Sequence, residues 1–171
     1  MRAGKWLVVV LVGVVVAGCG YHFRGRATNL PKDIHSIAIP VFANHTAEVG
    51  IERIFTDEVI YQFNRSRILN VVDLAKADAV LRGSIDRVDI TDVAYTSSDT
   101  SRQRRVRITI SAKLVRTRDG KVIWRGSGIV DQRTYDVADD PTQTEQNKTE
   151  AITTLAQAMA RTLHDRVFEN F

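Results

Sequence analysis

Apolar and polar positions alternate along much of the middle of the chain, and this period of two predicts β-strands. The clearest alternation covers residues 104–116, and less regular ones cover residues 34–42, 67–73, 79–95 and 121–131. In residues 104–116 one face is apolar and the other polar: Val106, Ile108, Ile110, Ala112 and Leu114 against Arg105, Arg107, Thr109, Ser111 and Lys113. We therefore expect a sheet with one face on a core and the other partly exposed to water.

Three local signals predict interruptions of these strands. The apolar positions of residues 79–95 switch twice between odd and even numbers, which predicts a β-bulge near residues 86–87 and another bend near residues 91–92. Pro40 has no amide hydrogen to donate, so the first strand should lie at a sheet edge or be bulged at this residue. Asp119-Gly120 is typical of a two-residue hairpin turn between the last two strands.

Two segments have the three- and four-residue apolar spacing of amphipathic helices: residues 49–66, and a final stretch that follows a loop over residues 132–141 and ends near Glu169. The expected buried positions are Ile51, Ile54, Phe55, Val59 and Phe63 in the first, and Ile152, Leu155, Ala156, Met159, Leu163 and Val167 in the second. The order of strand, helix, several strands and helix predicts an α+β fold, with two helices packed on one face of a four- or five-stranded mixed sheet.

The helix starts carry capping signals. Thr46 is a candidate cap for the first helix. The second helix could begin at Asp140, with Pro141 as its first residue, or at a capping box formed by Thr142 and Glu145. The pattern leaves both starts open.

The N-terminus predicts a secretory signal. Arg2 and Lys5 precede residues 6–17, which are apolar apart from Gly13 and are shorter than the roughly 20 residues that a bilayer-spanning helix needs. The alternative, a retained anchor helix, is disfavoured by this length. We therefore expect a signal peptide over residues 1–18, an extended arm over 19–33 and a single domain over 34–171.

The sequence Val16-Ala17-Gly18-Cys19 resembles the lipobox of bacterial lipoproteins, in which the cysteine thiol receives a diacylglycerol and the signal is cut just before it. Cys19 is the only cysteine, so it is the predicted lipidation site. By the same resemblance, Gly20 in the next position favours the outer membrane, with the domain on its periplasmic side. Two or three acyl chains make a lasting anchor.

Composition limits the remaining chemistry. Charged residues make up 26% and apolar residues 44%, which is typical of a globular domain, and one cysteine excludes an internal disulfide framework. No nucleophile–base or phosphate-loop motif is present, and the four histidines are scattered. Asp86, Asp89 and Asp92 should alternate between the faces of a strand, which argues against a cation site. We therefore predict a protein that is not an enzyme and holds no metal or cofactor.

Positive charge is concentrated in residues 101–130, where nine basic side chains accompany one acidic one. The candidate anion-binding residues are Arg102, Arg104, Arg105, Arg107 and Lys113. Arginine binds phosphate through paired N–H donors, but the same residues could simply be a solvated face that prevents aggregation. On the periplasmic side of an outer membrane, the expected phosphorylated ligand is lipopolysaccharide rather than nucleic acid.

The start Cys19-Gly20-Tyr21-His22-Phe23-Arg24, followed by IAIPVFAN at residues 37–44 and an amphipathic helix, resembles the LptE family of lipopolysaccharide-assembly lipoproteins. The resemblance implies a subunit that plugs and helps assemble the large LptD β-barrel of the outer membrane and binds lipopolysaccharide in transit. It assigns no individual basic residue, so the candidates could contact lipopolysaccharide or the polar barrel lumen. The alternative function is an accessory lipoprotein of another envelope secretion or transport system.

Replacing Cys19 by alanine should leave the precursor uncleaved and without lipid, because the thiol is the acyl acceptor on which cleavage of this signal class depends. Mass spectrometry of the membrane fraction measures both changes. Gly20→Ser keeps the thiol and serves as the processed control. A Cys19→Ala protein of normal mature mass would contradict the lipobox assignment.

Overall fold

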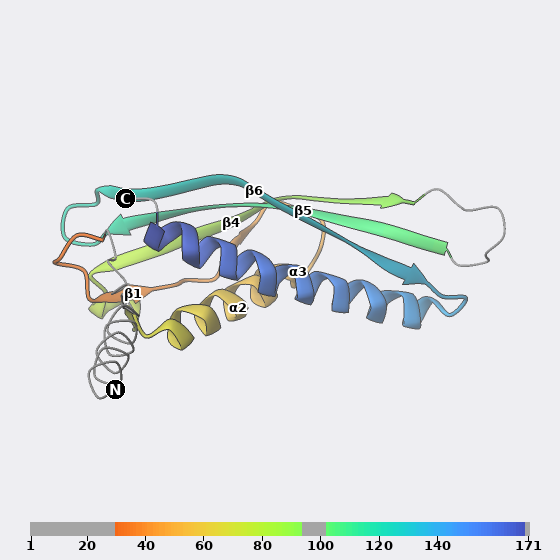
Figure 1. Cartoon of the computed structure of the whole chain (residues 1–171), viewed down its shortest axis with the longest axis horizontal. Helices are drawn as coiled ribbons and strands as arrows, with labels where there is room; N and C mark the ends of the chain where they lie inside the picture. Colours follow the sequence, from red (N-terminus) through yellow and green to blue (C-terminus); the bar gives the residue numbers. More distant parts are fainter. Residues whose placement is uncertain (1–29, 94–101, 170–171) are drawn as a thin grey trace, which may run out of the picture.

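The order of elements predicted from the sequence is the order found in the computed structural model, which describes residues 30–93 and 102–169 (Figure 1). The predicted signal peptide, Cys19, most of the arm and the end of the strand predicted over residues 79–95 lie outside these residues. In chain order the elements are β1 (Ser36–Ala38), β2 (Ala43–Asn44), α2 (Ile51–Ser66), β3 (Asn70–Val71), the 3-10 turn η1 (Leu74–Lys76), β4 (Ala79–Asp92), β5 (Arg102–Arg116), β6 (Val122–Val137) and α3 (Pro141–Glu169).

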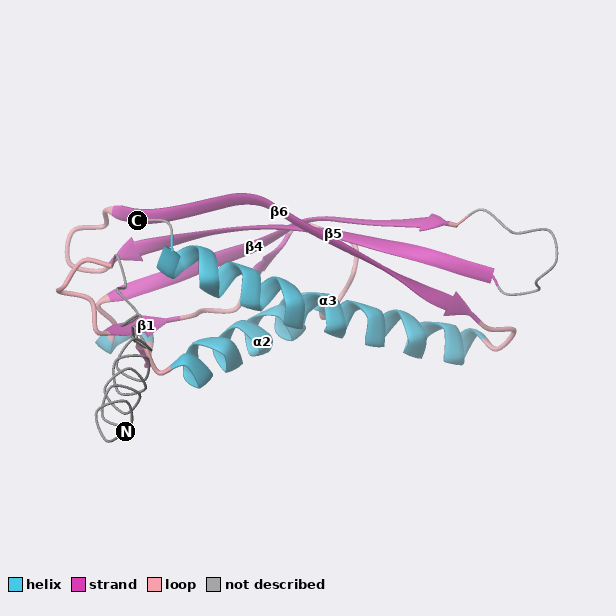
Figure 2. Cartoon of the chain, in the orientation of Figure 1, coloured by secondary structure: helices cyan, strands magenta, loops and turns pink. Residues whose placement is uncertain are grey.

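The strands form one mixed sheet, and both long helices lie on the same side of it (Figure 2). The strand order is β3-β1-β4-β5-β6, and β2 pairs with β4 beyond the end of β1. β1 and β2 run parallel to β4, whereas β4, β5 and β6 form an antiparallel meander. The α+β fold with helices on one face is confirmed, with six strands in the described part of the chain rather than four or five.

The extra strand arises because residues 34–42 do not form one strand. The chain leaves the sheet after β1, passes through Pro40 and rejoins it as β2. Of the two alternatives predicted from Pro40, the edge position is wrong, because β1 lies between β3 and β4, whereas an irregularity at Pro40 is found as this interruption. In the interruption Val41 turns outward and is 64% exposed, while Phe42 is buried and its N–H donates to Thr56 Oγ1 at 3.0 Å.

The first irregularity predicted in β4 is confirmed, and the second is wrong. The register with β5 shifts between Ile85 and Arg87, where one residue of β4 has no partner. No shift occurs near residues 91–92, since the ladder continues unbroken to the pair of Asp92 and Arg104. The bulge restores the apolar positions on either side of it to the same face.

β6 is longer than predicted. Residues 132–137, expected to be a loop, pair with β5 as far as its first residue, although only Tyr135 among them is buried. Their strand structure comes from backbone pairing with β5 rather than from an apolar alternation. Gly128 has a φ of +64°, and β6 has one extra residue there relative to β5, which makes a bulge that favours glycine.

Two shorter features also differ from their predicted lengths. The strand expected over residues 67–73 is confined to β3, at the edge of the sheet. The β5–β6 hairpin is confirmed, but its loop covers residues 117–121 and is longer than two residues. Gly120 takes a φ of +68° there, and its N–H donates to the carbonyl of Arg116 at 3.0 Å.

The residues at which the two helices begin show which of the predicted capping residues are used. Thr46 does not cap α2, because α2 begins at Ile51 after Gly50, which has a φ of +88°. Asp140 caps α3, since its Oδ1 accepts the N–H of Thr142 at 2.9 Å. The start with proline as the first helical residue is therefore the correct one.

The core fills the layer between the helices and the sheet. All five inward positions predicted for β5 are buried, and so are the predicted stripes of both helices, with Ile54 half-buried. Phe55, Phe63 and Leu163 are completely buried. Truncating a phenylalanine in such a position typically costs 3–5 kcal/mol of stability.

Asp78 joins β1 to the start of β4. Its Oδ2 accepts the backbone N–H groups of His35 at 3.0 Å and Ser36 at 2.9 Å, and the Ser36 hydroxyl at 2.8 Å. These hydrogen bonds favour the ionised carboxylate and so hold the pKa of Asp78 below its ordinary 3.8. The hydrogen bond from the His35 N–H has the largest effect on this pKa.

We expect Asp78→Asn to lower the free energy of unfolding at neutral pH. A carboxylate with a lowered folded pKa stabilises the protein above the unfolded pKa of 3.8 and loses this contribution as the pH falls through the folded pKa. The difference in free energy of unfolding between the unmodified protein and the variant should therefore become smaller below pH 3.8. Urea denaturation at several pH values measures it, with the exposed Asp57→Asn as control. A difference in free energy of unfolding that stays the same at every pH would contradict a stabilising role for the ionised Asp78 carboxylate.

Candidate functional site

The face of the sheet opposite the helices carries polar side chains. On β5 the residues predicted to point outward do so: Arg105, Arg107 and Lys113 are exposed, and Thr109 and Ser111 are half-buried. Neither helix covers this face (Figure 2). We call it the open face.

At one end of the open face, cross-strand register places three basic residues side by side. Arg82 of β4 lies directly opposite Lys113 of β5, and Lys113 lies directly opposite Arg125 of β6. All three are exposed. We call these residues the basic row. Directly opposed residues have Cβ atoms about 4.5–5.5 Å apart, so three positive charges occupy adjacent positions.

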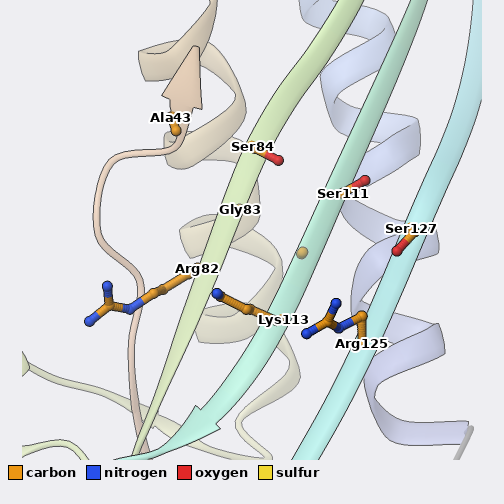
Figure 3. Close-up of a pocket in the computed structure, with 9 residues that line it drawn as sticks. Ala43, Arg82, Gly83, Ser84, Ser111, Lys113, Arg125 and Ser127 are labelled. Atoms are coloured by element: carbon orange, nitrogen blue, oxygen red, sulfur yellow. The ribbon is translucent and has the colours of Figure 1, made fainter. Parts of the chain in front are cut away.

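The basic row lines a shallow hollow of about 330 Å³ (Figure 3). Three serines, one from each strand, form its other side: Ser84, Ser111 and Ser127. We call them the serine row. The hollow is open to solvent, and no acidic side chain lines it among the residues that the structure describes.

Two of the serines donate to a carboxylate outside the hollow's lining. Asp86, in the β4 bulge, accepts the hydroxyl of Ser84 at 2.6 Å and that of Ser111 at 2.5 Å, and lies 4.0 Å from His45 Nδ1. Over residues 30–93 and 102–169, no carboxylate comes within 4.0 Å of a basic-row nitrogen. Like charges directly opposite each other destabilise a sheet, so the row opposes folding.

The other predicted basic residues lie at the far end of β5. Arg102 is the first residue of β5, and Lys113 follows Arg107 by six positions along the strand, roughly 20 Å. The structure thus divides the candidate set into a group at 102–107 and Lys113, which joins Arg82 and Arg125.

The described side chains of the 102–107 group are on different faces. Arg104 shares the helix-side face with Val106, and its Nε donates to Asp92 Oδ1 at 2.9 Å, which raises the pKa of the guanidinium. Arg107 points to the open face and donates from Nε and Nη2 to Gln132 Oε1 at 3.1 and 2.8 Å. Arg105 is also on the open face, exposed.

The three aspartates of β4, Asp86, Asp89 and Asp92, do not come together as a cation site. Asp86 and Asp89 both point to the open face, because the bulge adds a residue between them, so the expected strict alternation is wrong for this pair. Asp89 pairs with Arg87 at 2.9 Å, and Asp92 with Arg104. Within the described ranges no three metal-ligating side chains come together.

His164 lies in α3 with its Nδ1 3.0 Å from Asp165 Oδ1, and its side chain is only 14% exposed. The ring packs against Phe63 and Phe168, with centroids 5.1 and 4.7 Å away. His164 is therefore part of the contact between α2 and α3, not of a surface site.

Sequence reasoning selected neither Arg125 nor Arg82 as a candidate, although Arg125 lies within the basic segment of residues 101–130. Arg82 lies outside that segment, and only its register with Lys113 makes it relevant. The one available signal was its polar position next to Leu81 in the alternation of β4.

The fold is shared with small bacterial proteins, among them lipoproteins. A minor lipoprotein of Acinetobacter baumannii superposes with a TM-score of 0.53 at 11% identity, covering 80% of this chain and 93% of the other. An uncharacterized lipoprotein B of Nitrosomonas europaea gives 0.53 at 15% identity, covering 87% and 90%. A hypothetical protein of Chlamydia trachomatis gives 0.54 at 10% identity, covering 78% and 95%.

The chain belongs to the LptE lipopolysaccharide-assembly family, whose sequence model matches residues 34–167. The resemblance noted in the sequence is thereby confirmed. Members of this family are envelope-associated, non-enzymatic lipoproteins of lipopolysaccharide assembly. No curated protein matches the chain significantly. In the described part of the chain, neither helix is long and apolar enough to cross a membrane.

Lys113→Gln should raise the free energy of unfolding by about 0.2–1 kcal/mol, because it removes the central charge of the basic row. Urea denaturation at low salt measures the change, which should shrink as salt screens the repulsion. Lys76→Gln, at an exposed site on η1, is the matched control. A destabilised Lys113→Gln protein would show that the row is not repulsive.

Proposed function

We propose that this chain is the lipoprotein subunit of a lipopolysaccharide translocon. In this role it is anchored through Cys19 to the periplasmic side of the outer membrane, plugs and helps assemble an LptD-like β-barrel, and binds lipopolysaccharide on its way to the outer leaflet. The observation that carries the proposal is the LptE family match over residues 34–167.

The open face supports the plug role. The lumen of a large outer-membrane barrel is polar, so a protein within it has to present polar groups. The open face does so along the meander of β4, β5 and β6, while the apolar side chains face the helices. We assign Arg105 and Arg107, at the far end of this face, to contact with the barrel wall.

The basic side chains of the open face also support binding of a phosphorylated glycolipid. Guanidinium groups donate paired hydrogen bonds to phosphate oxygens, and these bonds are stronger than neutral ones. The protein offers such groups on a rigid sheet rather than on a loop. A reaction on the ligand is not part of the proposal, since the family is non-enzymatic.

Purification of the tagged, lipidated chain from outer membranes should recover a large β-barrel protein, identified by mass spectrometry. Arg105→Glu with Arg107→Glu should reduce the recovered barrel by more than about tenfold, because reversed charges at a polar interface cost several kcal/mol. The control carries the same charge change on exposed α3 residues, Arg161→Glu with Arg166→Glu.

Two outcomes would contradict the proposal. Recovery of a different envelope complex without a barrel would favour the alternative of an accessory lipoprotein for another transport system. Equal barrel recovery by both double variants would show that Arg105 and Arg107 do not contact the barrel.

A further inference from the structure

We propose that an apolar groove at the β3 edge of the sheet binds the chain's own N-terminal arm, with Tyr21 and Phe23 as the residues that fill it. This role of the arm goes beyond the proposed function, which it needs only for the lipid at Cys19. Residues 20–29 lie outside the described part of the chain, so the arm enters through its sequence and its length.

The groove lies where the edge of the sheet is incomplete, between α2, η1 and the end of β1. Its volume is about 570 Å³, a size that accommodates ligand-sized groups. The lining is mainly apolar and includes two charged residues of opposite sign: Pro40, Ile60, Val72 and Leu74, with Asp73 and Lys76. We call it the apolar groove.

The apolar groove leaves large apolar side chains in contact with water. Leu74 is 54% exposed, Pro40 is exposed, and Ile60 and Val72 are only half-buried. Covering these side chains removes apolar surface from water, which favours an apolar occupant.

β3 offers a free backbone edge beside the apolar groove. The N–H of Asn70 donates to the carbonyl of His35 at 3.0 Å, and that of Val72 donates to the carbonyl of Ile37 at 3.0 Å. The N–H and C=O of Val71, between them, therefore point away from β1. Among the residues described, no strand pairs with this side of β3. An extended peptide can bind such an edge through its backbone while alternate side chains enter a neighbouring pocket.

The arm has the sequence pattern of such a peptide. Tyr21 and Phe23 are two positions apart, so in an extended segment they share one side, with His22 and Arg24 on the other. They are the only large apolar residues of the segment 20–29. Aromatic side chains bury a large apolar area, and a tyrosine can do so while its hydroxyl stays in water.

The arm is also long enough to reach the apolar groove. Leu30, the first described residue, is followed by a turn in which the N–H of Ile34 donates to the carbonyl of Pro31 at 3.1 Å. Because of this turn, Leu30 lies within about 22 Å of Ile37, which is in register with β3. Phe23 precedes Leu30 by seven positions, which reach up to about 25 Å. The arm would run opposite in direction to β3, since it ends at the start of β1.

A bound arm changes how the domain is held at the membrane. Eleven positions separate Cys19 from Leu30, a reach of up to about 40 Å, which leaves the domain free to turn. Phe23 is only four positions from Cys19, a reach of at most about 14 Å. Binding of Phe23 therefore places the β3 edge next to the lipid anchor and fixes which edge of the domain faces the membrane.

The rate at which a water-soluble maleimide labels Lys76→Cys, in the full lipidated chain in detergent, measures whether the apolar groove is covered. Acylation leaves Cys19, the only native cysteine, without a thiol. Labelling should be at least about tenfold slower with the native arm than with Tyr21→Ser/Phe23→Ser, because a tethered segment has a high effective concentration. Equal labelling of Lys76→Cys with both arms would overturn the inference.

Two matched controls test the specificity of this protection. Tyr61→Cys, at a site on α2 that is 57% exposed and outside the apolar groove, should be labelled at one rate with either arm. His22→Ser changes the other side of the arm and should leave the labelling of Lys76→Cys slow. Protection lost equally in His22→Ser and in Tyr21→Ser/Phe23→Ser would overturn the role of the aromatic residues.

Cross-linking locates the arm directly. Oxidation with diamide should form an intramolecular disulfide in Phe23→Cys/Lys76→Cys at least about tenfold faster than in Phe23→Cys/Tyr61→Cys, since a disulfide needs Cα atoms within about 7 Å of each other. Equal rates in the two pairs would overturn the placement of the arm in the apolar groove.

The remaining outcomes separate this inference from the proposed function, because neither measurement uses a barrel or lipopolysaccharide. Protection of Lys76→Cys that requires the copurified barrel and persists in Tyr21→Ser/Phe23→Ser would overturn the arm as the occupant and assign the apolar groove to the barrel. Recovery of the barrel by a chain whose Lys76→Cys is labelled fast with the native arm would overturn the inference and leave the proposed function intact.

Discussion

β5 is hydrogen-bonded to β4 on one side and to β6 on the other along almost its whole length. This double pairing determines which side chains of three strands are neighbours, and the rest of the molecule depends on it. It creates the apolar surface on which the helices pack, since the inward residues of all three strands then lie in register. It also converts polar positions that are distant in sequence into one continuous open face.

The two faces of the sheet have opposite energetic roles. The helix-side face stabilises the domain by burying large apolar residues such as Phe55, Ile108 and Leu163. The open face contains a feature that opposes stability, the directly opposed charges of Arg82, Lys113 and Arg125. Destabilising features retained on an otherwise well-packed scaffold are typical of functional surfaces, because the stability lost there is balanced by burial elsewhere.

The family assignment and the geometry together suggest a division of the open face. The proposed barrel contact uses the far end, where Arg107 donates to Gln132, and the basic row, a candidate for the proposed lipopolysaccharide contact, lies at the near end. From the sequence, these two roles compete for one set of basic residues. The structure separates the residues by roughly 20 Å along β5, so both roles can coexist.

The sequence by itself determined both helices, the inward and outward positions of β5 and the bulge in β4, because each follows from a local periodicity that burial imposes. It also carried enough of the family pattern to indicate lipopolysaccharide assembly. Only the tertiary structure decided that Pro40 interrupts a central strand, that residues 132–137 are paired, and that Lys113 meets Arg82 and Arg125. The physical reason is that strand partners and register depend on hydrogen bonds between distant segments, which leave no mark on the pattern of either segment alone.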